Sequence, residues 1–528
     1  MSVRLHFHGA AGCVTGACFR ITSEAAEVLV DCGLFQGSKT LKELNYQPFP
    51  FAPRQLDAVL LTHAHIDHSG QIPRLHRAGF DGEVFATPAT RELCAVLLPD
   101  AGGIQEAEVE QLNRRQQRRG RATVTPIYTR ADAEACMAAF RVVPLGDWVT
   151  VAAGMRARWW NAGHILGSAS IELEVERPGG EALRLCFSGD IGPGDRDFAA
   201  DPEGPANLDH VIVEATYGGS ERPSLDRRSR RALLAREVTA AHAAGGPLVI
   251  PAFAVERTQE LLVDLLAIMD EGLAPDCHIY LDSPLAIRAS EVFLRQGGGS
   301  GGGANPFAAL AGRRHLRTTE SVDESRSLER LRGWHIIMAG SGMCDAGRIR
   351  HHLKRLLWRP EATVLLSGFQ AIGTLGRLLQ DGARQVKIQG EDVRVRARIR
   401  ALDVYSGHAD AAGLAAWVAA RGRIAGNIFI THGEPDSARA LAARLAQEGR
   451  DPARLRRPEI DDSYTLDHGP ARRRPAAARI QPGAAGALDW HNARAAFLLE
   501  LDEALRAGGD DAARAALLSD LRGRLKTP

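Results

Sequence analysis

The order of hydrophobic and polar positions predicts a chain of short strands that end in polar or glycine-rich loops. The apolar run Ala58–Leu61 is typical of a strand buried on both faces of a sheet. It leads directly into a polar segment at residues 62–70, and the stretch Ile72–Ala78 then predicts a helix. Three further strands are expected earlier in the chain, at Leu5–His8, Ala17–Thr22 and Val28–Val30.

Beyond residue 89 the pattern changes along the chain. Residues 89–140 are polar and predict helices, whereas residues 215–400 alternate between apolar strands and helices, as parallel α/β units do. Residues 471–487 are rich in Arg, Ala, Pro and Gly and predict a linker, including Arg472–Arg474. Asp489–Lys526 predicts two amphipathic helices broken at Gly508–Gly509, and the glycine run 297–303 predicts a surface loop. Further strands are expected at 141–143, 150–159, Leu183–Phe187, His210–Val213, Pro247–Ile250, Ile279–Leu281, His335–Ala339, Thr363–Ser367, Arg400–Val404 and Asn427–Ile430.

Length and composition set the limits of this picture. At roughly 100–200 residues per domain, 528 residues predict three or four units, or two large units with appendages. A hydrophobic fraction of 45% is ordinary for globular domains, and a net charge of +1 gives no overall attraction to nucleic acid or to anionic membranes. The eight cysteines are scattered without a Cys-x-x-Cys pair, and no run of 18 apolar residues occurs. We therefore expect a cytoplasmic protein without a membrane span.

The segment His63-x-His65-x-Asp67-His68 is the clearest chemical feature of the sequence. Three imidazoles and a carboxylate in six residues suit zinc, which binds histidine nitrogen and aspartate oxygen. On the turning backbone after a buried strand, His63 and His65 project to one side, and Asp67 and His68 can reach a second point nearby. One such segment suits two metal ions better than one.

A single segment cannot complete two metal sites, so other loops must contribute. His164 lies between two strand-like stretches, and Asp190 follows the strand Leu183–Phe187. Polar groups at strand ends are where sites of α/β proteins gather. Each residue alone is more typical of a turn, but together with the histidine segment both become candidate ligands.

The order Asp31, His63-x-His65-x-Asp67-His68, His164, Asp190 resembles the metallo-β-lactamase fold. Beyond Asp190 the sequence resembles the β-CASP branch of ribonucleases, which includes the cleavage and polyadenylation specificity factor endonuclease and its bacterial and archaeal relatives. The segments that carry this second resemblance are Glu214–Gly218, Ser406–Asp410 and Thr431–Glu434, with phrases such as Asp282–Ala286 and Ser341–Met343 between them. Roughly residues 3–470 are covered.

The resemblance implies an αββα metallo-β-lactamase sandwich with an inserted β-CASP α/β domain and a short helical tail. The lactamase domain would comprise residues 1–214 and 400–470, the β-CASP domain residues 215–399, and the linker and tail residues 471–528.

The same resemblance implies two Zn²⁺ ions. A first zinc would bind His63, His65 and His164, a second Asp67, His68 and His432, and Asp190 would bridge them. Asp31 would orient a ligand histidine without binding a metal itself. Asp67, Glu214 and His408 are the expected catalytic residues, with His408 as the general acid paired with Glu214. Arg348 and Arg377, each in a glycine-rich context, are weaker candidates for contacts with substrate phosphates.

The implied function is zinc-dependent hydrolysis of RNA phosphodiester bonds by a hydroxide that bridges the two metals, with RNA processing or decay as the role. Single-stranded RNA is the expected partner, and a homodimer is one candidate assembly because dimers are common in the family. A DNA nuclease of the same superfamily is the main alternative, although its members usually carry an aliphatic residue where His432 stands. A metal-free scaffold disagrees with the intact ligand set, and a thioesterase or lactamase would leave Glu214, His408 and the insert unexplained.

Overall fold

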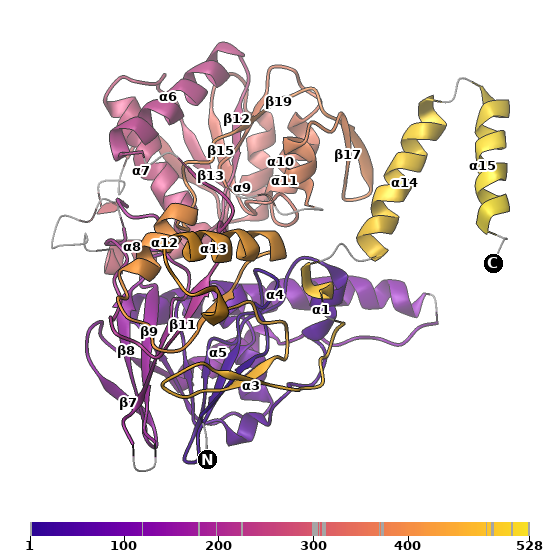
Figure 1. The fold of residues 1–528 in the computed structure, drawn as a ribbon. Helices are drawn as coiled ribbons and strands as arrows, with labels where there is room; N and C mark the ends of the chain where they lie inside the picture. The colour runs from indigo at the N-terminus through magenta and orange to yellow at the C-terminus, as the bar shows by residue number, and fades with distance from the viewer. Residues whose placement is uncertain are drawn as a thin grey trace.

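The fold is described from a computed structural model. It describes residues 3–118, 120–177, 180–196, 198–222, 225–297, 305, 307–308, 313–368, 370, 374–481, 483–486, 490–507 and 510–525. Figure 1 shows a lower body formed by both ends of the main fold, an upper body formed by the middle of the chain, and two C-terminal helices beside them.

The lower body contains two sheets that are stacked face to face. The first has eight strands, antiparallel from β23 to β3 and parallel from β3 to β6. In spatial order these are β23 (Arg472–Arg474), β22 (Ser463–Thr465), β1 (Arg4–Phe7), β2 (Phe19–Thr22), β3 (Glu27–Val30), β4 (Ala58–Leu60), β5 (Glu83–Ala86) and β6 (Phe140–Val142).

The second sheet has seven strands and mixes parallel and antiparallel pairs in the same way. Its spatial order is β21 (Leu455–Arg456), β20 (Ile428–Thr431), β11 (His210–Glu214), β10 (Leu183–Phe187), β9 (Ala169–Val175), β8 (Met155–Asn161) and β7 (Val149–Ala152). Residues from both ends of the chain therefore complete both sheets.

A hydrophobic core joins the two sheets. Leu60 and Phe85 of the first sheet pack against Trp159 and Phe187 of the second. The Trp159 indole donates a hydrogen bond of 3.1 Å to the Leu61 carbonyl, so this large side chain is both buried and satisfied.

Helices cover the outer faces of both sheets and complete an αββα sandwich, as predicted. The first sheet is covered by α3 (Ile72–Arg77), α4 (Pro88–Gln117) and α5 (Arg130–Cys136), and the second by α12 (Ala411–Ala419) and α13 (Pro435–Gln447). Two short helices, α1 (Lys39–Leu44) and α2 (Ile66–Ser69), lie in loops that follow strands.

The upper body is an insert built on one parallel six-stranded sheet. Its strands are β14 (Leu316–Thr318), β13 (Ile279–Leu281), β15 (Ile336–Ala339), β12 (Leu248–Pro251), β16 (Thr363–Leu366) and β19 (Arg398–Ala401). Leu248 and Ile250 point to one face and Val249 to the other, and both faces are buried. The helices of the insert are α6 (Arg227–Ala243), α7 (Arg257–Asp270), α8 (Pro284–Gln296), α9 (Val322–Ser327), α10 (Ile349–Leu356) and α11 (Leu375–Gln380), and β17 (Gln385–Ile388) and β18 (Glu391–Arg394) form a hairpin.

Three expectations from the sequence are corrected. The stretch 150–159 is part of a hairpin, β7 and β8, with a turn at Gly154. The strand expected at Arg400–Val404 begins and ends earlier, at Arg398–Ala401, and pairs with β16 of the insert. Arg472–Arg474 is not linker: it forms the edge strand β23 on β22, because an edge strand can expose all its side chains and still be held by backbone hydrogen bonds.

The C-terminal segment forms two helices, α14 (Trp490–Ala507) and α15 (Asp511–Leu525), as the amphipathic pattern predicts. Arg506 of α14 pairs with Asp392 of β18 at 3.1 Å. The predicted break at Gly508–Gly509, and most of the glycine run 297–303, lie outside the described residues. No helix among the described residues is long and apolar enough to cross a membrane.

Candidate metal centre

The candidate site residues come from seven separate places in the fold, and most of these are strand ends. His63 follows β4, and His65, Asp67 and His68 lie at or in α2, the helix that begins three residues later. The other positions are the β8–β9 loop for His164, the end of β10 for Asp190, the last residue of β11 for Glu214, the loop after β19 for His408 and the end of β20 for His432. Strands of the two sheets thus deliver their polar ends to one point.

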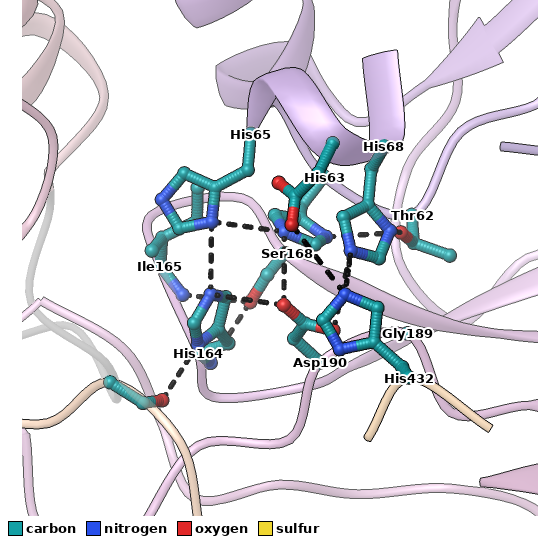
Figure 2. A network of polar contacts seen from close by, with 12 residues as sticks. Thr62, His63, His65, His68, His164, Ile165, Ser168, Gly189, Asp190 and His432 are labelled. Atoms are coloured by element: carbon teal, nitrogen blue, oxygen red, sulfur yellow. Dashed lines mark hydrogen bonds and ion pairs between the residues drawn. The ribbon is translucent and has the colours of Figure 1, made fainter. Parts of the chain in front are cut away.

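One group of ligand atoms is formed by His63, His65, His164 and Asp190. His65 Nδ1 lies 3.1 Å from His63 Nε2 and 3.2 Å from His164 Nε2. Asp190 Oδ2 lies 3.5 Å from His63 Nε2 and 3.6 Å from His164 Nε2 (Figure 2). These four side chains therefore point their ligand atoms at a common centre.

A second group, formed by Asp67, His68 and His432, lies on the other side of Asp190. His68 Nε2 is 3.1 Å from His432 Nε2, and Asp67 Oδ2 is 3.6 Å from the same His432 atom. Asp190 Oδ1 lies 3.4 Å from His68 Nε2. One carboxylate thus faces both groups, with one oxygen toward each (Figure 2).

Hydrogen bonds on the far side of His68 and His63 determine which nitrogen each ring presents. Asp31 Oδ2 accepts from His68 Nδ1 at 2.7 Å and from the Thr62 hydroxyl at 2.8 Å. Because that hydroxyl donates to Asp31, it can accept from His63 Nδ1, which lies 3.0 Å away. Both rings therefore direct Nε2 into the site.

His164 and His432 are oriented by the same principle. The carbonyl of Gly407 accepts from His164 Nδ1 at 2.7 Å. The Thr216 hydroxyl donates to the His432 carbonyl and lies 3.1 Å from His432 Nδ1, from which it can accept. The Nε2 atoms of both rings therefore remain available as ligands.

This arrangement fits a pair of metal cations. His68 Nδ1 faces Asp31, and His432 Nδ1 faces the Thr216 hydroxyl and also lies 3.4 Å from Asp190 Oδ1. The two Nε2 atoms lie 3.1 Å apart, so a proton or a metal ion must lie between them. Asp190 Oδ1 is buried and has no hydrogen-bond partner among the described residues, although buried carboxylate oxygens are normally satisfied. Imidazole nitrogen and carboxylate oxygen are ligands that zinc prefers.

The pKa shifts agree with a centre that favours cations. Burial lowers the pKa of His63 and His164 well below the usual range and that of His65 to about 4, so these rings are neutral, as ligands must be. Burial also opposes charge on His68, but the carboxylates of Asp190 and Asp31 raise its pKa well above the usual range. The second group therefore attracts positive charge.

The two carboxylates of the centre are ionised. Burial alone would raise the pKa of Asp67, but the His432 hydrogen bond and nearby histidines hold it at about 2. The same opposition, with His432, His68 and His63 outweighing burial, holds the pKa of Asp190 well below the usual range. Both carboxylates can therefore bind a metal without losing a proton.

Glu214 and His408 form a pair beside the first group. His408 Nδ1 donates to Glu214 Oε1 at 3.1 Å and lies 4.0 Å from Asp190 Oδ2. Glu214 also accepts from the backbone N–H groups of Ile191 and Thr216, so its oxygens are occupied by donors. Burial would lower the pKa of His408, but Glu214 raises it, which favours a protonated ring.

Arg348 and Arg377 lie in the insert and bind protein groups. Arg348 donates to Asp282 Oδ1 at 2.7 Å and to the Thr319 carbonyl at 3.1 Å. Arg377 pairs with Asp381 one helical turn away. Their contact with phosphates stays a prediction, and the turn at 371–373 before Arg377 lies outside the described residues.

Sequence reasoning missed the groups that orient the ligands. Thr62 and Thr216 act through their hydroxyls, and Gly407 acts through its carbonyl. Thr62 and Thr216 are each next to or near a motif residue, but nothing in their residue type separates them from ordinary loop threonines. Only their position beside a ring nitrogen assigns the role.

Comparisons with known proteins place this centre in a family. The chain matches the model of the metallo-beta-lactamase superfamily over residues 11–93, the Beta-Casp domain over 258–379 and the Zn-dependent metallo-hydrolase RNA specificity domain over 392–455. These matches cover the histidine segment, the middle part of the insert and the return to the second sheet.

Whole-chain relatives agree. Ribonuclease TTHA0252 of Thermus thermophilus is 34% identical over 457 residues, which cover 84% of this chain and 96% of that protein. Transcription termination factor FttA of Methanosarcina mazei is 28% identical over 464 residues, 82% of this chain and 68% of that protein, and its namesake in Pyrococcus abyssi is 29% identical over 457 residues, 80% and 66%. The fold, the two ligand groups around Asp190 and these matches together show that the chain belongs to the β-CASP family of metallo-hydrolases, within the metallo-β-lactamase superfamily.

Proposed function

We propose that this protein is a zinc-dependent ribonuclease that hydrolyses phosphodiester bonds of single-stranded RNA. The observation that carries the proposal is the Asp190 carboxylate, which faces one ligand group with each oxygen. Separate sites would not need a shared carboxylate, whereas a two-metal hydrolase does. The similarity to a named ribonuclease along 96% of that relative supports RNA as the substrate.

The proposed ligand sets follow the two groups. The first zinc would bind His63 Nε2, His65 Nδ1 and His164 Nε2. The second would bind Asp67, His68 Nε2 and His432 Nε2, with Asp190 between the two. The outward hydrogen bonds of the rings support these atoms, because each leaves one nitrogen bare.

Two zinc ions, when bound, lower the pKa of a water molecule and neutralise charge on the phosphate under attack. The chain supplies the remainder of the chemistry. Asp31 and Thr62 hold His68 and His63 in fixed tautomers, which keeps ligand atoms in place through the reaction.

The departing ribose oxygen needs a proton, and His408 is placed to supply it. Glu214 accepts from Nδ1, so a proton on Nε2 is the one available for transfer. The carboxylate also raises the pKa of His408, which favours the protonated ring that a general acid needs. Glu214 is thus a positioning residue, and His408 is the general acid.

We also propose that the insert, residues 215–399, acts as a lid over the metal centre. The metallo-β-lactamase domain would comprise residues 1–214 and 400–470, and the linker and tail residues 471–528. The strand pairings support this, since β11 and β20 join chain ends into one sheet and the insert has a sheet of its own. β19 extends the insert's sheet to Ala401. The homodimer stays a prediction.

The test uses purified, metal-analysed protein and end-labelled single-stranded RNA and DNA of equal sequence. We expect cleavage of the RNA alone, with 5′-phosphate and 3′-hydroxyl ends, and loss of cleavage in Asp190→Asn. Faster cleavage of DNA would establish the DNA nuclease alternative. Intact RNA with zinc-loaded protein would instead support a scaffold.

A further inference from the structure

We propose that the end of α4 and the segment that returns from it form a second RNA-binding surface, here called the arginine arm (residues 104–128). The inference rests on the proposed function, because it assumes that RNA is the substrate. Residues 114–121 contain five arginines, and no acidic residue occurs between 111 and 131. In a chain with a net charge of +1, this is a local concentration of positive charge.

The arm projects from the body of the protein. The first half of α4 packs in the core through Leu93, Leu97 and Leu98, and Val109 is the last residue of the helix that is described as buried. Eight more helical residues extend about 12 Å past Val109 at 1.5 Å per residue. Figure 1 shows the violet helix extending to the right beyond the strands, below α14.

The arm consists of two segments in contact, the end of α4 and the segment that returns from it. The returning segment is fastened to the helix by the Asn113 amide, which donates to the Val124 carbonyl and accepts from the Val124 N–H, both at 2.8 Å. Tyr128, which is fully buried, anchors the base of the returning segment, and its N–H donates to Gln105. The returning segment is therefore fixed against the helix at Val124 and at Tyr128.

Two of the arginines in the arm have no acidic partner among the described residues. Arg114 pairs with Glu110 at 2.6 Å, but the exposed side chains of Arg118 and Arg121 make no hydrogen bond or ion pair with any described residue; only their backbone N–H groups donate, to the Arg114 and Gln116 carbonyls. Nearby surface arginines do have acidic partners, such as Arg288 with Asp100. The helix dipole can stabilise arginines in the last turn of α4. It does not account for Arg121, which lies beyond the end of the helix.

A phosphate backbone is the partner that this surface fits. Exposed guanidinium groups bind phosphates in a bidentate manner, and the release of counterions makes such binding depend on salt. The arm projects outward from the body. An RNA bound at the metal centre must therefore extend beyond the catalytic site to contact the arm. Ile104, Leu112 and Val124 are exposed on the same arm, so a protein partner is the competing occupant.

The experiment measures RNA affinity of the catalytically inactive Asp190→Asn chain as a function of RNA length and salt. The arm variant carries Arg114→Gln, Arg118→Gln and Arg121→Gln, which keep good helix formers. The matched control removes the same charge elsewhere, with Arg326→Gln, Arg439→Gln and Arg524→Gln, three exposed arginines that have acidic partners.

For a 30-nucleotide RNA we expect the arm variant to bind about tenfold more weakly at low salt. Its slope of log K against log salt should fall by about 2, at roughly 0.7 for each of three lost phosphate contacts. A 6-nucleotide RNA should bind both variants and the parent equally. Equal slopes in arm variant and parent, or an equal fall in the control, would overturn the proposal and leave the arm as a protein-docking surface.

The two proposals fail separately. A wild-type chain that binds long RNA through the arm but cleaves none would contradict the ribonuclease and keep the arm. A chain that cleaves RNA with an arm-independent salt slope would do the reverse.

Discussion

Single hydrogen bonds on the outer nitrogens decide the chemistry of this centre. A histidine ligand is useful only when its bare nitrogen faces the metal, and here Asp31, Thr62, Thr216 and the Gly407 carbonyl fix that choice. Asp31 serves two rings at once, His68 directly and His63 through Thr62. Loss of this one carboxylate should therefore loosen both ligand groups.

We expect Asp31→Ala to bind zinc roughly 10–100-fold more weakly, because partners of metal-ligating histidines contribute on that scale. Added zinc should restore part of the cleavage rate. Zinc affinity, measured by competition with a chromogenic chelator, checks this. Asp57→Ala is a matched control, since Asp57 accepts a 2.8 Å hydrogen bond from the Glu27 N–H outside the site. Equal zinc affinity in Asp31→Ala and wild type would make Asp31 a turn residue.

The two late histidines should differ when each is removed. His432→Ala should lose zinc as well as rate, whereas His408→Ala should keep both zinc ions and lose rate roughly 10²–10⁴-fold. On an aryl phosphodiester, whose leaving oxygen needs no proton, the His408→Ala defect should shrink and the His432→Ala defect should persist. Glu214→Gln should resemble His408→Ala in milder form. Zinc loss in His408→Ala would refute this division of roles.

The residue identities of the centre could be predicted from sequence, while their partners could not. His63, His65, Asp67 and His68 form a dense local pattern after a strand, and pattern and spacing are visible in one dimension. Thr62, Thr216 and Gly407 have no such pattern, because their roles depend on contacts across up to 243 positions of sequence.

At the scale of elements, the start of α7 connects the insert to the metal centre. Glu256 precedes α7 with φ of 64° and accepts a hydrogen bond of 3.1 Å from the Leu166 N–H, in the loop that carries His164. One helical turn later, the buried Glu260 pairs with Arg196 of the loop after Asp190. The insert therefore supports two ligand loops from above.

Glu256→Ala should destabilise the protein by about 1–3 kcal/mol, because it leaves the buried Leu166 N–H without a partner. Burial, followed by the charge of Glu260, raises the pKa of Glu256 well above the usual range, which favours the neutral side chain. Glu256→Gln should then be close to wild type, since its amide oxygen can still accept. Urea denaturation of zinc-loaded protein compares the two, and equal losses in both variants would contradict this role.

Elements with a strong apolar pattern could be predicted from the sequence. A polar strand, and a stretch that contains a turn between two strands, could not. Leu183–Phe187 and Ile279–Leu281 match β10 and β13 residue for residue, because most of their side chains are hydrophobic and buried. Arg472–Arg474 has no apolar side chain and is a strand only because β22 offers an open edge. The pairing of β23 with β22 makes this segment a strand, and the sequence of the segment alone does not contain that information.

At the scale of the whole molecule, the metal centre connects the two sheets of the sandwich. Its proposed ligands come from the ends of β4, β10 and β20, from α2 and from the β8–β9 loop, so both sheets of the sandwich meet there. Bound metal should therefore stabilise the sandwich as a unit, with a contribution that depends on free metal concentration.

Removal of zinc by a chelator should lower the melting temperature of the wild-type protein. At a free concentration 100-fold above Kd, a bound ligand contributes about 2.7 kcal/mol, which disappears when the metal is removed. Differential scanning calorimetry with and without chelator measures the shift, and readdition of zinc should reverse it. Asp190→Asn should show a smaller shift. An unchanged melting temperature in wild type would mean that zinc contributes nothing to the fold.

The most direct test of the central claim is zinc titration of metal-free protein with cleavage of single-stranded RNA as the readout. If Asp190 holds two ions in one catalytic centre, the rate should stay low up to one equivalent, rise steeply with the second and reach a plateau at two. The same titration with DNA of equal sequence should stay near the baseline. A plateau already at one equivalent, or full RNA cleavage by metal-free protein, would contradict the two-zinc ribonuclease.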